Sequence, residues 1–578
     1  MPLGTFDRQQ NIARLGAGTY DVLVIGGGIT GAGVALDAAA RGLRTALVER
    51  DDFASGTSSK SSKLVHGGLR YLQNGDVRLV YEALHERQRL LHNAPHLVKV
   101  LPFLIPVFTG KGGIIPRQVA RALGSAMWMY DLTGGLRIGK LHRRLKSDAA
   151  RAHMPTLGER LAWAYLYYDA QTDDARLTLT LARTAALDFG ATVVNHATVT
   201  GLRKDGDRVT GAYVDPSPGH SGPGTGLDGE RTPTGASGPI EVSARVVVNA
   251  TGVWADGLRA LDEGSDPGSI RPAKGIHITV PWDKVRNDIA AVVPVPKDRR
   301  SVFVVPWPGD DGTVGGPGSV TYIGTTDTDY DGDVDDPQCT ADDVAYLLDA
   351  INHSVTVPLD ESDVLATWAG LRPLVKDSDA SGRTADMSRR HRVLVSDGGM
   401  ITVIGGKLTT YREMAEDTVD QAVRLAGDAV PRRAGRHRTR RLRLRGAEGW
   451  EQAADADLHL GERYGSEAGV LDAMIDTDPS LGEPLVPGLP YRRAEAVYAA
   501  RYEMAVTLDD VLSRRTRARL RNRDAAAAAA AEVAELVGGE LGWSEAERAA
   551  EVAAYRAASE HERRVPGLPE IVALASGR

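Results

Sequence analysis

The sequence predicts an α/β + α protein with a Rossmann-type domain, an antiparallel-sheet domain beside it, and a C-terminal helical domain. Three observations indicate this architecture. Residues 19–50 read as strand, glycine turn, helix and second strand, which is a complete βαβ unit. Strand-like runs recur between residues 270 and 400, and a tail rich in Ala and Glu begins near residue 447.

Later segments are expected to complete the two sheets. ARVVVNATG (244–252) is predicted to return a buried strand to the first sheet. The runs KGIHITV, RSVFVVPW, SVTYIGTT and HRVLVSD are expected in the antiparallel sheet. Residues 215–239, rich in Gly, Pro and Ser, are expected to form a mobile loop between two strands rather than a domain boundary.

The tail is expected to fold into several helices. Asp524 is a suitable N-cap for a helix that runs through seven alanines and ends at Gly538 and Gly539. Residues 506–520, VTLDDVLSRRTRARL, are expected to form another helix.

Composition narrows the class of protein. The chain has 578 residues, 42% hydrophobic and 25% charged, with a net charge of −7, so nothing in its overall charge favours nucleic acid. Cys339 is the only cysteine, which excludes an intrachain disulfide and fits a reducing compartment. No signal peptide and no apolar run of membrane-spanning length is visible, so we expect a cytoplasmic chain or one attached to a membrane from one side.

The strongest motif is the glycine turn after the first strand. Gly26, Gly28 and Gly31 have the GxGxxG spacing that turns the chain, admits a pyrophosphate and lets helix approach strand. Glu49 ends the second strand, where a carboxylate accepts hydrogen bonds from a ribose and repels a 2′-phosphate. A dinucleotide other than NADP is therefore predicted.

Two further segments favour FAD over NAD. NATG (249–252), with Ala250 and Gly252, is a strand end made of small residues. VIGGKLTTYREMAED (403–417) is a second strand, Gly-Gly turn and helix, whose N-terminus suits the flavin edge where negative charge collects on reduction. Two helices opened by glycines suit one elongated cofactor.

SSKLVHGGLRYL (61–72), DDARL (173–177), KGIH (274–277), IGTTDTDYDGD (323–333), GLRPL (370–374) and GGKLTTYR (405–412) resemble, in this order, the signature segments of FAD-dependent glycerol-3-phosphate dehydrogenases. The resemblance spans roughly residues 18–420. It implies oxidation of sn-glycerol 3-phosphate to dihydroxyacetone phosphate, with the flavin electrons passed to a membrane quinone.

The chemistry of such an oxidation needs a base, cations for a phosphate and an open flavin face. His66 is a titratable base near neutral pH, Gly67 and Gly68 let backbone approach the flavin, and Arg70 with Tyr71 can hold substrate. A histidine satisfied within the core is the alternative for His66.

The resemblance adds cations to this set. It places Arg372 at the flavin, where it contacts the substrate, and Arg389 and Lys407 at the phosphate, with Arg390 able to replace Arg389. Lys274 is a further cation expected near the substrate. The alternative interpretation is that Arg372 forms a salt bridge at the surface.

The hydroxyl-rich segment SGTSSKSSK (55–63) is by itself an ordinary polar turn, and the resemblance puts its side chains on the cofactor. The residues expected to contact FAD are Gly26, Gly28, Gly31, Glu49, Thr57, Ser58, Ser59, Ser61, Ser62, His66, Gly67, Gly68, Ala250, Gly252, Gly405, Gly406, Lys407, Leu408 and Thr409.

The implied domains comprise a flexible N-terminal extension (1–18), an oxidoreductase core (19–430), an Arg-rich linker (431–446) and a C-terminal α-helical domain (447–578). Within the core, FAD-binding segments are expected at about 19–75, 170–260 and 365–425, and substrate segments at about 76–169 and 261–364.

Two basic stretches bear on whether the protein binds a membrane or nucleic acid. Residues 111–146 mix aromatic and apolar residues with Lys and Arg, which is typical of a helix lying on an anionic membrane or of a core-packed helix; the resemblance favours the membrane, peripherally on the inner face of the cell membrane. The arginines of 432–446 are read as an edge strand within a linker, and no nucleic acid is expected. Residues 325–333 lack the glutamate of a calcium loop, so no metal is expected.

Three alternatives remain open at this level. A glycerol-3-phosphate oxidase would share the fold and the substrate cations but pass electrons to O2 and make H2O2. A flavin-binding regulator would not need the cations, and a flavin amine oxidase would not need so many. A homodimer is also left open.

Overall fold

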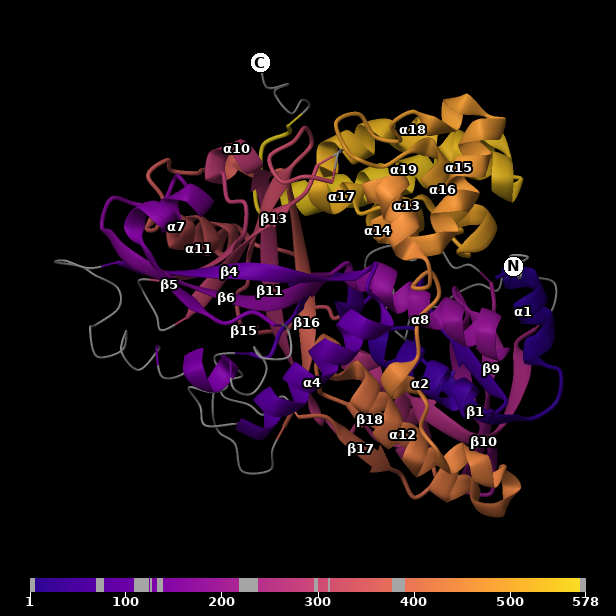
Figure 1. Ribbon diagram of the computed structural model, residues 1–578. Coiled ribbons are helices and arrows are strands. Elements are labelled where there is room, and N and C mark those ends of the chain that lie inside the picture. Colours follow the sequence, from indigo (N-terminus) through magenta and orange to yellow (C-terminus); the bar gives the residue numbers. More distant parts are fainter. Residues whose placement is uncertain are drawn as a thin grey trace.

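The computed structural model describes residues 6–68, 77–108, 124, 127–131, 139–217, 238–295, 300–309, 312–376 and 390–571 (Figure 1). Two sheets lie side by side, and the C-terminal helices, coloured orange to yellow, sit together at one end of the molecule. No helix formed by these described residues is long and apolar enough to cross a membrane.

The first sheet is the predicted Rossmann-type sheet. β1 (Tyr20–Ile25) pairs in parallel with β2 (Thr45–Val48) and β10 (Ile240–Asn249), confirming that ARVVVNATG returns to this sheet. Its helices include α2 (Ile29–Ala40), α8 (Asp174–Phe189) and α12 (Tyr411–Ala426). The other strands are β7 (Thr192–Val194), β8 (Thr198–Asp205), β9 (Arg208–Asp215), β17 (Arg392–Val395) and β18 (Ile401–Ile404).

Apolar strands are buried on both faces here, since helices cover both sides of a parallel sheet. β2 is buried at every position and its apolar run has no polar alternation. HRVLVSD was expected in the antiparallel sheet, and this was wrong: β17 pairs with β18 at the edge of the first sheet. A three-residue apolar run carries too little pattern to say which of two sheets it joins.

The second sheet is largely antiparallel, as predicted, with order β15-β11-β14-β13-β12-β4-β6-β3. β11 also pairs with β16, and β5 with β6. Its strands are β3 (Leu64–Val65), β4 (Val98–Phe108), β5 (Arg143–Lys146), β6 (Leu161–Thr172), β11 (Ile270–Pro281), β12 (Ala290–Pro294), β13 (Ser301–Trp307), β14 (Val320–Gly324), β15 (Thr328–Asp329) and β16 (Ala366–Val375).

Helices around this core complete the two domains. β9 and β10 pair in an antiparallel ladder on either side of the 215–239 insertion, as expected of a loop between two strands. The additional helices before residue 430 are α4 (Val77–Asn93), α7 (Ser147–His153), α9 (Ala255–Glu263), α10 (Trp282–Val285) and α11 (Ala341–Asn352), with short turns η1 (Thr57–Ser59), η3 (Gly252–Trp254), η4 (Glu361–Asp363), η6 (Leu408–Thr410) and η7 (Gly427–Ala429).

The N-terminal segment is not the flexible extension that we expected over residues 1–18, as far as it is described. α1 (Arg8–Leu15) is capped by the Asp7 carboxylate, which accepts from the Gln10 N–H. Phe6 and Leu15 are buried, and Arg8 donates to the carbonyls of Asn195 and His196. Two buried apolar side chains are enough to fix a short helix on a sheet edge, although they make no visible periodic pattern in the sequence.

The tail is helical, as predicted. Its elements are α13 (Trp450–Ala456), α14 (Leu458–Tyr464), η10 (Gly465–Glu467), α15 (Ala468–Thr477), η11 (Pro479–Gly482), α16 (Arg493–Tyr502), the π-helix η12 (Asp510–Arg515), α17 (Ala518–Arg521), α18 (Arg523–Leu541) and α19 (Glu545–Arg564).

Two details of the tail differ from the prediction. α18 is capped by Asn522, not Asp524, and runs through Gly538 and Gly539 to a left-handed Gly542. A Cβ at Gly538 would lie 2.8 Å from the Arg548 side chain, so close packing, not helix termination, explains this glycine. The helix expected over 506–520 is split into η12 and α17 at Arg517, whose φ is +99°.

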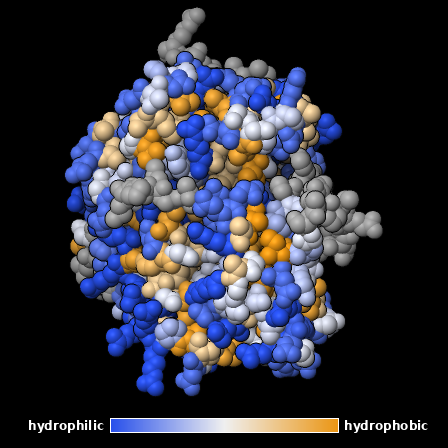
Figure 2. Space-filling view, turned by 90° about the vertical axis from the view of Figure 1, so that its right-hand side faces the viewer, coloured by the Kyte–Doolittle hydropathy of each residue, from blue (hydrophilic) through white to orange (hydrophobic). Residues whose placement is uncertain are grey.

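The arginines of 432–446 form the short turns η8 (Arg432–Gly435) and η9 (Thr439–Arg441) among the described residues, and not the edge strand that we expected. Arg440 pairs with Glu416, and Arg445 with Asp188 and Glu467. These ion pairs fasten the segment to the domains on either side. Figure 2 shows one face of the molecule, on which hydrophobic residues occur in small groups between hydrophilic ones.

Candidate functional site

The glycine turn after β1 has no room for side chains. Gly26 has a φ of +111°, and a Cβ there would lie 2.6 Å from the Ala250 carbonyl oxygen. A Cβ at Gly31 would lie 1.8 Å from the Gly26 carbonyl oxygen. Gly28 is the N-cap residue of α2. The structure thus brings Gly26, Gly31 and Ala250 together at the opening of a helix, where amide N–H groups favour phosphate.

Glu49 lies at the other side of this turn, at the end of β2. Its carboxylate accepts from the N–H of Gly27 at 2.5 Å and from the N–H of Asp51 at 2.9 Å. Burial, with the nearby Asp51 carboxylate, raises its pKa, although these two backbone donors oppose the shift. A carboxylate in this place suits a ribose hydroxyl.

A second helix opened by glycines approaches the first. Gly405 and Gly406 have φ values of +76° and +79°, followed by η6 and α12. A Cβ at Gly33 of α2 would lie 2.7 Å from the Tyr411 ring of α12, so the two helices are in close contact near their N-termini. Lys407, Leu408 and Thr409 lie between the glycines and α12.

We call residues 56–63, whose Thr57, Ser58, Ser59, Ser61 and Ser62 were predicted to contact FAD, the cofactor loop. The Ser58 hydroxyl accepts from the Ile29 N–H at 2.9 Å, at the N-terminus of α2. The other hydroxyls have protein partners: Thr57 donates to the Leu371 carbonyl, Ser61 to Asp174, and Ser62 lies 2.9 Å from His277. Gly252, with a φ of +64°, lies three residues after the end of β10 at Asn249.

The main chain of the cofactor loop is held by Lys63 of the loop itself and by side chains from distant segments. The Ser59 carbonyl accepts from Arg517 and Lys63, the Ser61 carbonyl from Trp368, and the Ser62 carbonyl from Tyr322. Ser59 therefore contributes backbone, not its hydroxyl, to these contacts.

His66 and its glycines follow the loop. The His66 N–H donates to the Thr409 hydroxyl at 3.3 Å, which joins two of the predicted site segments. The His66 ring lies 6.1 Å from the Phe303 ring between centroids. The Gly67 N–H donates to the Tyr130 hydroxyl at 3.0 Å, and Gly68 has a φ of +77°.

Arg372 lies on β16, on the face that meets the cofactor loop. Its guanidinium donates to Asp327 at 3.2 Å and to the hydroxyl of Thr325 at 3.3 Å. A Cβ at Gly275 would lie 2.6 Å from this guanidinium, and a Cβ at Gly370 would lie 2.4 Å from the Lys60 carbonyl. Gly275 of the KGIH motif thus makes room for an arginine.

Lys274 lies apart from this group. Its ammonium pairs with Asp343 at 2.6 Å and donates to the Gln338 carbonyl. Because neighbouring strand residues point to opposite faces, Lys274 faces α11 when Gly275 faces Arg372. The structure therefore does not bring Lys274 to the predicted substrate side.

His277 is a residue that the sequence interpretation passed over. It lies on the same face as Gly275, stacked on Trp368 with centroids 4.7 Å apart. Burial, aided by the Lys63 and Arg372 charges, holds its pKa well below the ordinary value, so the ring is neutral. Its buried Nδ1 has no hydrogen-bond partner among the residues that the structure describes.

Three predicted residues, Arg70, Tyr71 and Arg389, lie outside the described residues. The alternative Arg390 is described, and its carbonyl oxygen would lie 2.8 Å from a Cβ at Gly405.

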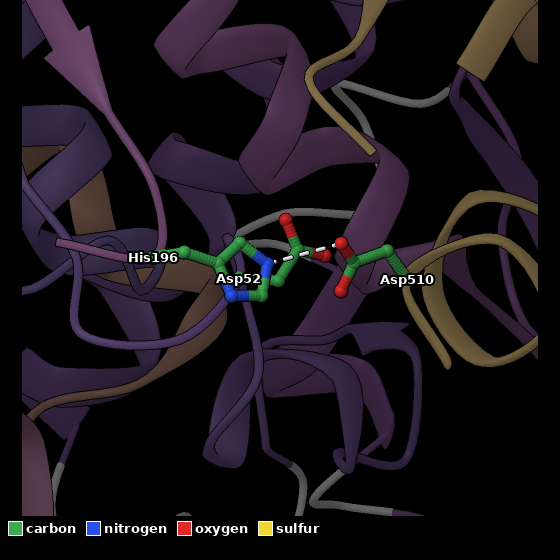
Figure 3. A group of neighbouring side chains, drawn as sticks. All are labelled: Asp52, His196 and Asp510. Atoms are coloured by element: carbon green, nitrogen blue, oxygen red, sulfur yellow. Dashed lines mark hydrogen bonds and ion pairs between the residues drawn. The ribbon is translucent and has the colours of Figure 1, made fainter. Parts of the chain in front are cut away.

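A buried cluster of Asp52, His196 and Asp510 has the side chains of a metal site (Figure 3). However, Asp52 already accepts from Asn195, Arg514 and Arg515. Two guanidinium groups beside the cluster would repel a divalent cation. We interpret it as an ion-pair centre, in which His196 lies 3.0 Å from Asp510.

The glycine turn, Glu49 and the second glycine-opened helix together fit a dinucleotide with a flavin. The glycines of the turn leave room for a pyrophosphate to contact main-chain N–H groups, and the Glu49 carboxylate is placed to accept a hydrogen bond from a ribose hydroxyl. Two helix N-termini contribute positive dipoles. This geometry agrees with FAD.

Comparison with known proteins gives two family matches. The model of the FAD dependent oxidoreductase family matches residues 21–412, and the model of the C-terminal domain of alpha-glycerophosphate oxidase matches residues 435–548.

Individual relatives cover nearly the whole chain. The chain is 39% identical to glycerol-3-phosphate dehydrogenase 2 of Mycobacterium tuberculosis, over 97% of this chain and 91% of the relative. It is 39% identical to the mitochondrial glycerol-3-phosphate dehydrogenase of Rattus norvegicus, over 91% and 71%. The solved glycerol-3-phosphate dehydrogenase of Bacillus halodurans complexed with FAD matches with a TM-score of 0.72 and 29% identity, covering 96% of this chain and 97% of that one.

Proposed function

We propose a function from the premise that this chain belongs to the FAD-dependent glycerol-3-phosphate dehydrogenases. FAD is its cofactor. The chain oxidises sn-glycerol 3-phosphate to dihydroxyacetone phosphate and passes the electrons to a membrane quinone.

The observation that carries the proposal is the position of Arg372. It is a partly exposed guanidinium, 22% exposed at its side chain, on the strand face that packs against the cofactor loop. Asp327 and the Thr325 hydroxyl accept from this guanidinium and fix its position, and the planar fork of an arginine matches the geometry of oxyanions. A cation beside a flavin loop suits a phosphorylated alcohol and has no role in binding FAD through its glycine turn.

FAD, when bound, supplies the two-electron acceptor that takes the C2 hydride at N5. The residues of the chain must orient that C–H bond and remove the hydroxyl proton. His66 is the base expected from the sequence, and His277 is a second candidate because its neutral Nδ1 has no partner in the described part of the chain. Lys407 and either Arg389 or Arg390 hold the phosphate, and Arg372 holds the substrate near its hydroxyl.

Quinone as acceptor requires access to a membrane, and we propose that the chain lies peripherally on the cytoplasmic face. Support comes from Trp128 and Met129, which are 57% and 46% exposed. The Trp128 ring lies 5.0 Å from the His142 ring, and His142 directly precedes the exposed basic residues Arg143 and Arg144 of β5. Exposed aromatics with basic neighbours suit an anionic lipid surface.

Anaerobic mixing with glycerol 3-phosphate in a stopped-flow spectrometer tests the proposal. The flavin absorbance of the wild type should bleach, and Arg372→Ala should bleach ~10²-fold more slowly or worse, a loss typical of one removed charge-stabilising group. His66→Ala and His277→Ala decide between the two bases. A flavin that stays oxidised with saturating substrate contradicts the proposal.

The second candidate function is the oxidase, which shares the same substrate side. The match of residues 435–548 to a domain named for alpha-glycerophosphate oxidase is the observation in its favour. Oxygen uptake and reduction of a soluble quinone analogue, measured on the same preparation, separate the two. A faster reaction with oxygen would establish the oxidase.

A further inference from the structure

The cofactor loop receives one side chain from the C-terminal domain. Arg517 donates from Nη2 to the Ser59 carbonyl at 2.6 Å and to the Asp174 carboxylate at 2.7 Å. Arg517 and Asp174 are both completely buried. A guanidinium shared between a loop carbonyl and a carboxylate is a directional contact, because its donors lie in a fixed plane.

Asp174 links Arg517 to the next residues of the loop. Its carboxylate accepts from the N–H and the hydroxyl of Ser61, at 3.1 and 2.6 Å, and from the Lys63 ammonium at 3.0 Å. Arg517 and Lys63 also meet at the same Ser59 carbonyl. The backbone between Ser59 and Lys63 is thus fixed at both ends by one buried charge cluster.

The backbone at both cations is unusual. Arg517 has a φ of +99° and Lys63 a φ of +57°, in the left-handed region that residues with a Cβ rarely adopt. Arg517 also follows directly on the π-helix η12 and Thr516. Such conformations cost free energy and persist at sites where geometry matters.

We propose that Arg517 is a positioning residue that sets the cofactor loop for FAD. The inference rests on the proposed function, in which this loop faces the flavin. Arg517 acts through the Ser59 carbonyl and not by contact with FAD or substrate. It fixes the Ser59 carbonyl, and through that the preceding Ser58, whose hydroxyl accepts from the N–H of Ile29 at the start of α2.

The test compares Arg517→Met with Arg519→Met as purified holoenzymes. Arg519 pairs only within the C-terminal domain, with Asp509 and Glu562 among its described partners. Free flavin is measured by fluorescence after serial dilution, and the bound flavin spectrum is recorded. Arg517→Met should weaken FAD binding about ten-fold or more, as expected for a lost charge-assisted hydrogen bond, and should shift the visible flavin bands. Arg519→Met should retain both properties.

A third variant separates positioning from folding. Arg517→Lys keeps the charge but cannot donate to the Ser59 carbonyl and Asp174 with the geometry of a planar fork. It should fold with a thermal midpoint near that of the wild type and still release flavin more readily. If Arg517→Met does not yield soluble protein, Arg517→Lys alone carries the test.

Equal flavin loss in Arg517→Met and Arg519→Met would overturn the inference, as would wild-type flavin binding and spectrum in Arg517→Lys. Flavin release involves no substrate. A wild-type enzyme that holds FAD but is not reduced by glycerol 3-phosphate therefore contradicts the proposed function and leaves the comparison of variants intact.

Discussion

The glycine turn at residues 26–31 and the cofactor loop at residues 56–63 meet at the N-terminus of α2, where Ser58 accepts from the Ile29 N–H, but they are held in different ways. In the turn, absent side chains let backbone pack against backbone, as between Gly31 and the Gly26 carbonyl. In the loop, carbonyl groups accept from Arg517, Trp368 and Tyr322, which are hundreds of residues away in sequence.

This difference predicts two kinds of sensitivity. A turn in which glycines pack backbone against backbone has no room for a side chain, because a single methyl group would meet backbone that cannot move aside. A loop held by several hydrogen bonds loses stability stepwise, since each contact contributes only part of the total. The following variants test this contrast.

The largest effect is expected for Gly31→Ala. The new methyl carbon would lie 1.8 Å from the Gly26 carbonyl oxygen, so the turn and the start of α2 must separate. The purified protein should contain essentially no flavin, measured by absorbance at the flavin band against protein absorbance. Gly469→Ala is the control, since its Cβ would meet nothing within 4 Å. Normal flavin content in Gly31→Ala would show that the turn does not depend on the absence of a side chain at this position.

For the cofactor loop, the change to compare with Gly31→Ala is Asp174→Asn, at the carboxylate that accepts from Ser61 and Lys63. It leaves Lys63 and Arg517 buried without their shared carboxylate, and removing one partner of a buried ion pair typically costs ~3–5 kcal/mol. Urea unfolding followed by circular dichroism should show this loss in the free energy of unfolding. The exposed Asp455→Asn should leave the midpoint unchanged. A cost below ~1 kcal/mol would mean that the cluster is as weak as a surface pair.

His196→Gln should change how stability depends on pH. Burial disfavours the charged ring, but the Asp510 carboxylate outweighs burial and raises the pKa of His196. The ion pair therefore stabilises the fold fully below the unfolded-state value near 6.5 and is lost as pH rises through the raised folded-state pKa. The gap in urea midpoint between wild type and variant should narrow from pH 6 to pH 9. A gap that widens would reverse the assigned sign.

Tyr322→Phe is expected to have the smallest effect. It removes one neutral hydrogen bond to the Ser62 carbonyl and leaves the other loop contacts in place. The expected loss in the free energy of unfolding is about 1 kcal/mol, with FAD retained. Flavin release after dilution and urea unfolding measure the two quantities. Complete loss of flavin in this variant would show that the loop is as sensitive to a single substitution as the turn.

The same contrast explains what the sequence could predict. Gly26, Gly31 and Glu49 were identifiable because their constraint is local and appears as a fixed spacing after a strand. The second glycine-opened helix at Gly405 and Gly406 was predictable for the same reason. In both segments the glycines follow a strand within a few residues, so the pattern is visible in the sequence although some contacts of these segments are distant.

The rest depends on distant pairs. Lys274 and Gly275 adjoin in sequence, yet only the pairing of β11 with β16 decides which of them faces Arg372. His277 looked ordinary until its contacts with Trp368 and Ser62 were known. Asp174 and Arg517 stand 343 residues apart, and no local pattern marks either as a partner of the cofactor loop.

That separation along the chain has a consequence for how the protein is made. A ribosome adds residues at about 5–20 per second, so Arg517 emerges tens of seconds after Asp174. Tyr322 and Trp368 emerge earlier than Arg517 and can reach their loop carbonyls first, whereas the Ser59 carbonyl still lacks its guanidinium. The cofactor loop therefore reaches its final set of partners only after residue 517 has been synthesised.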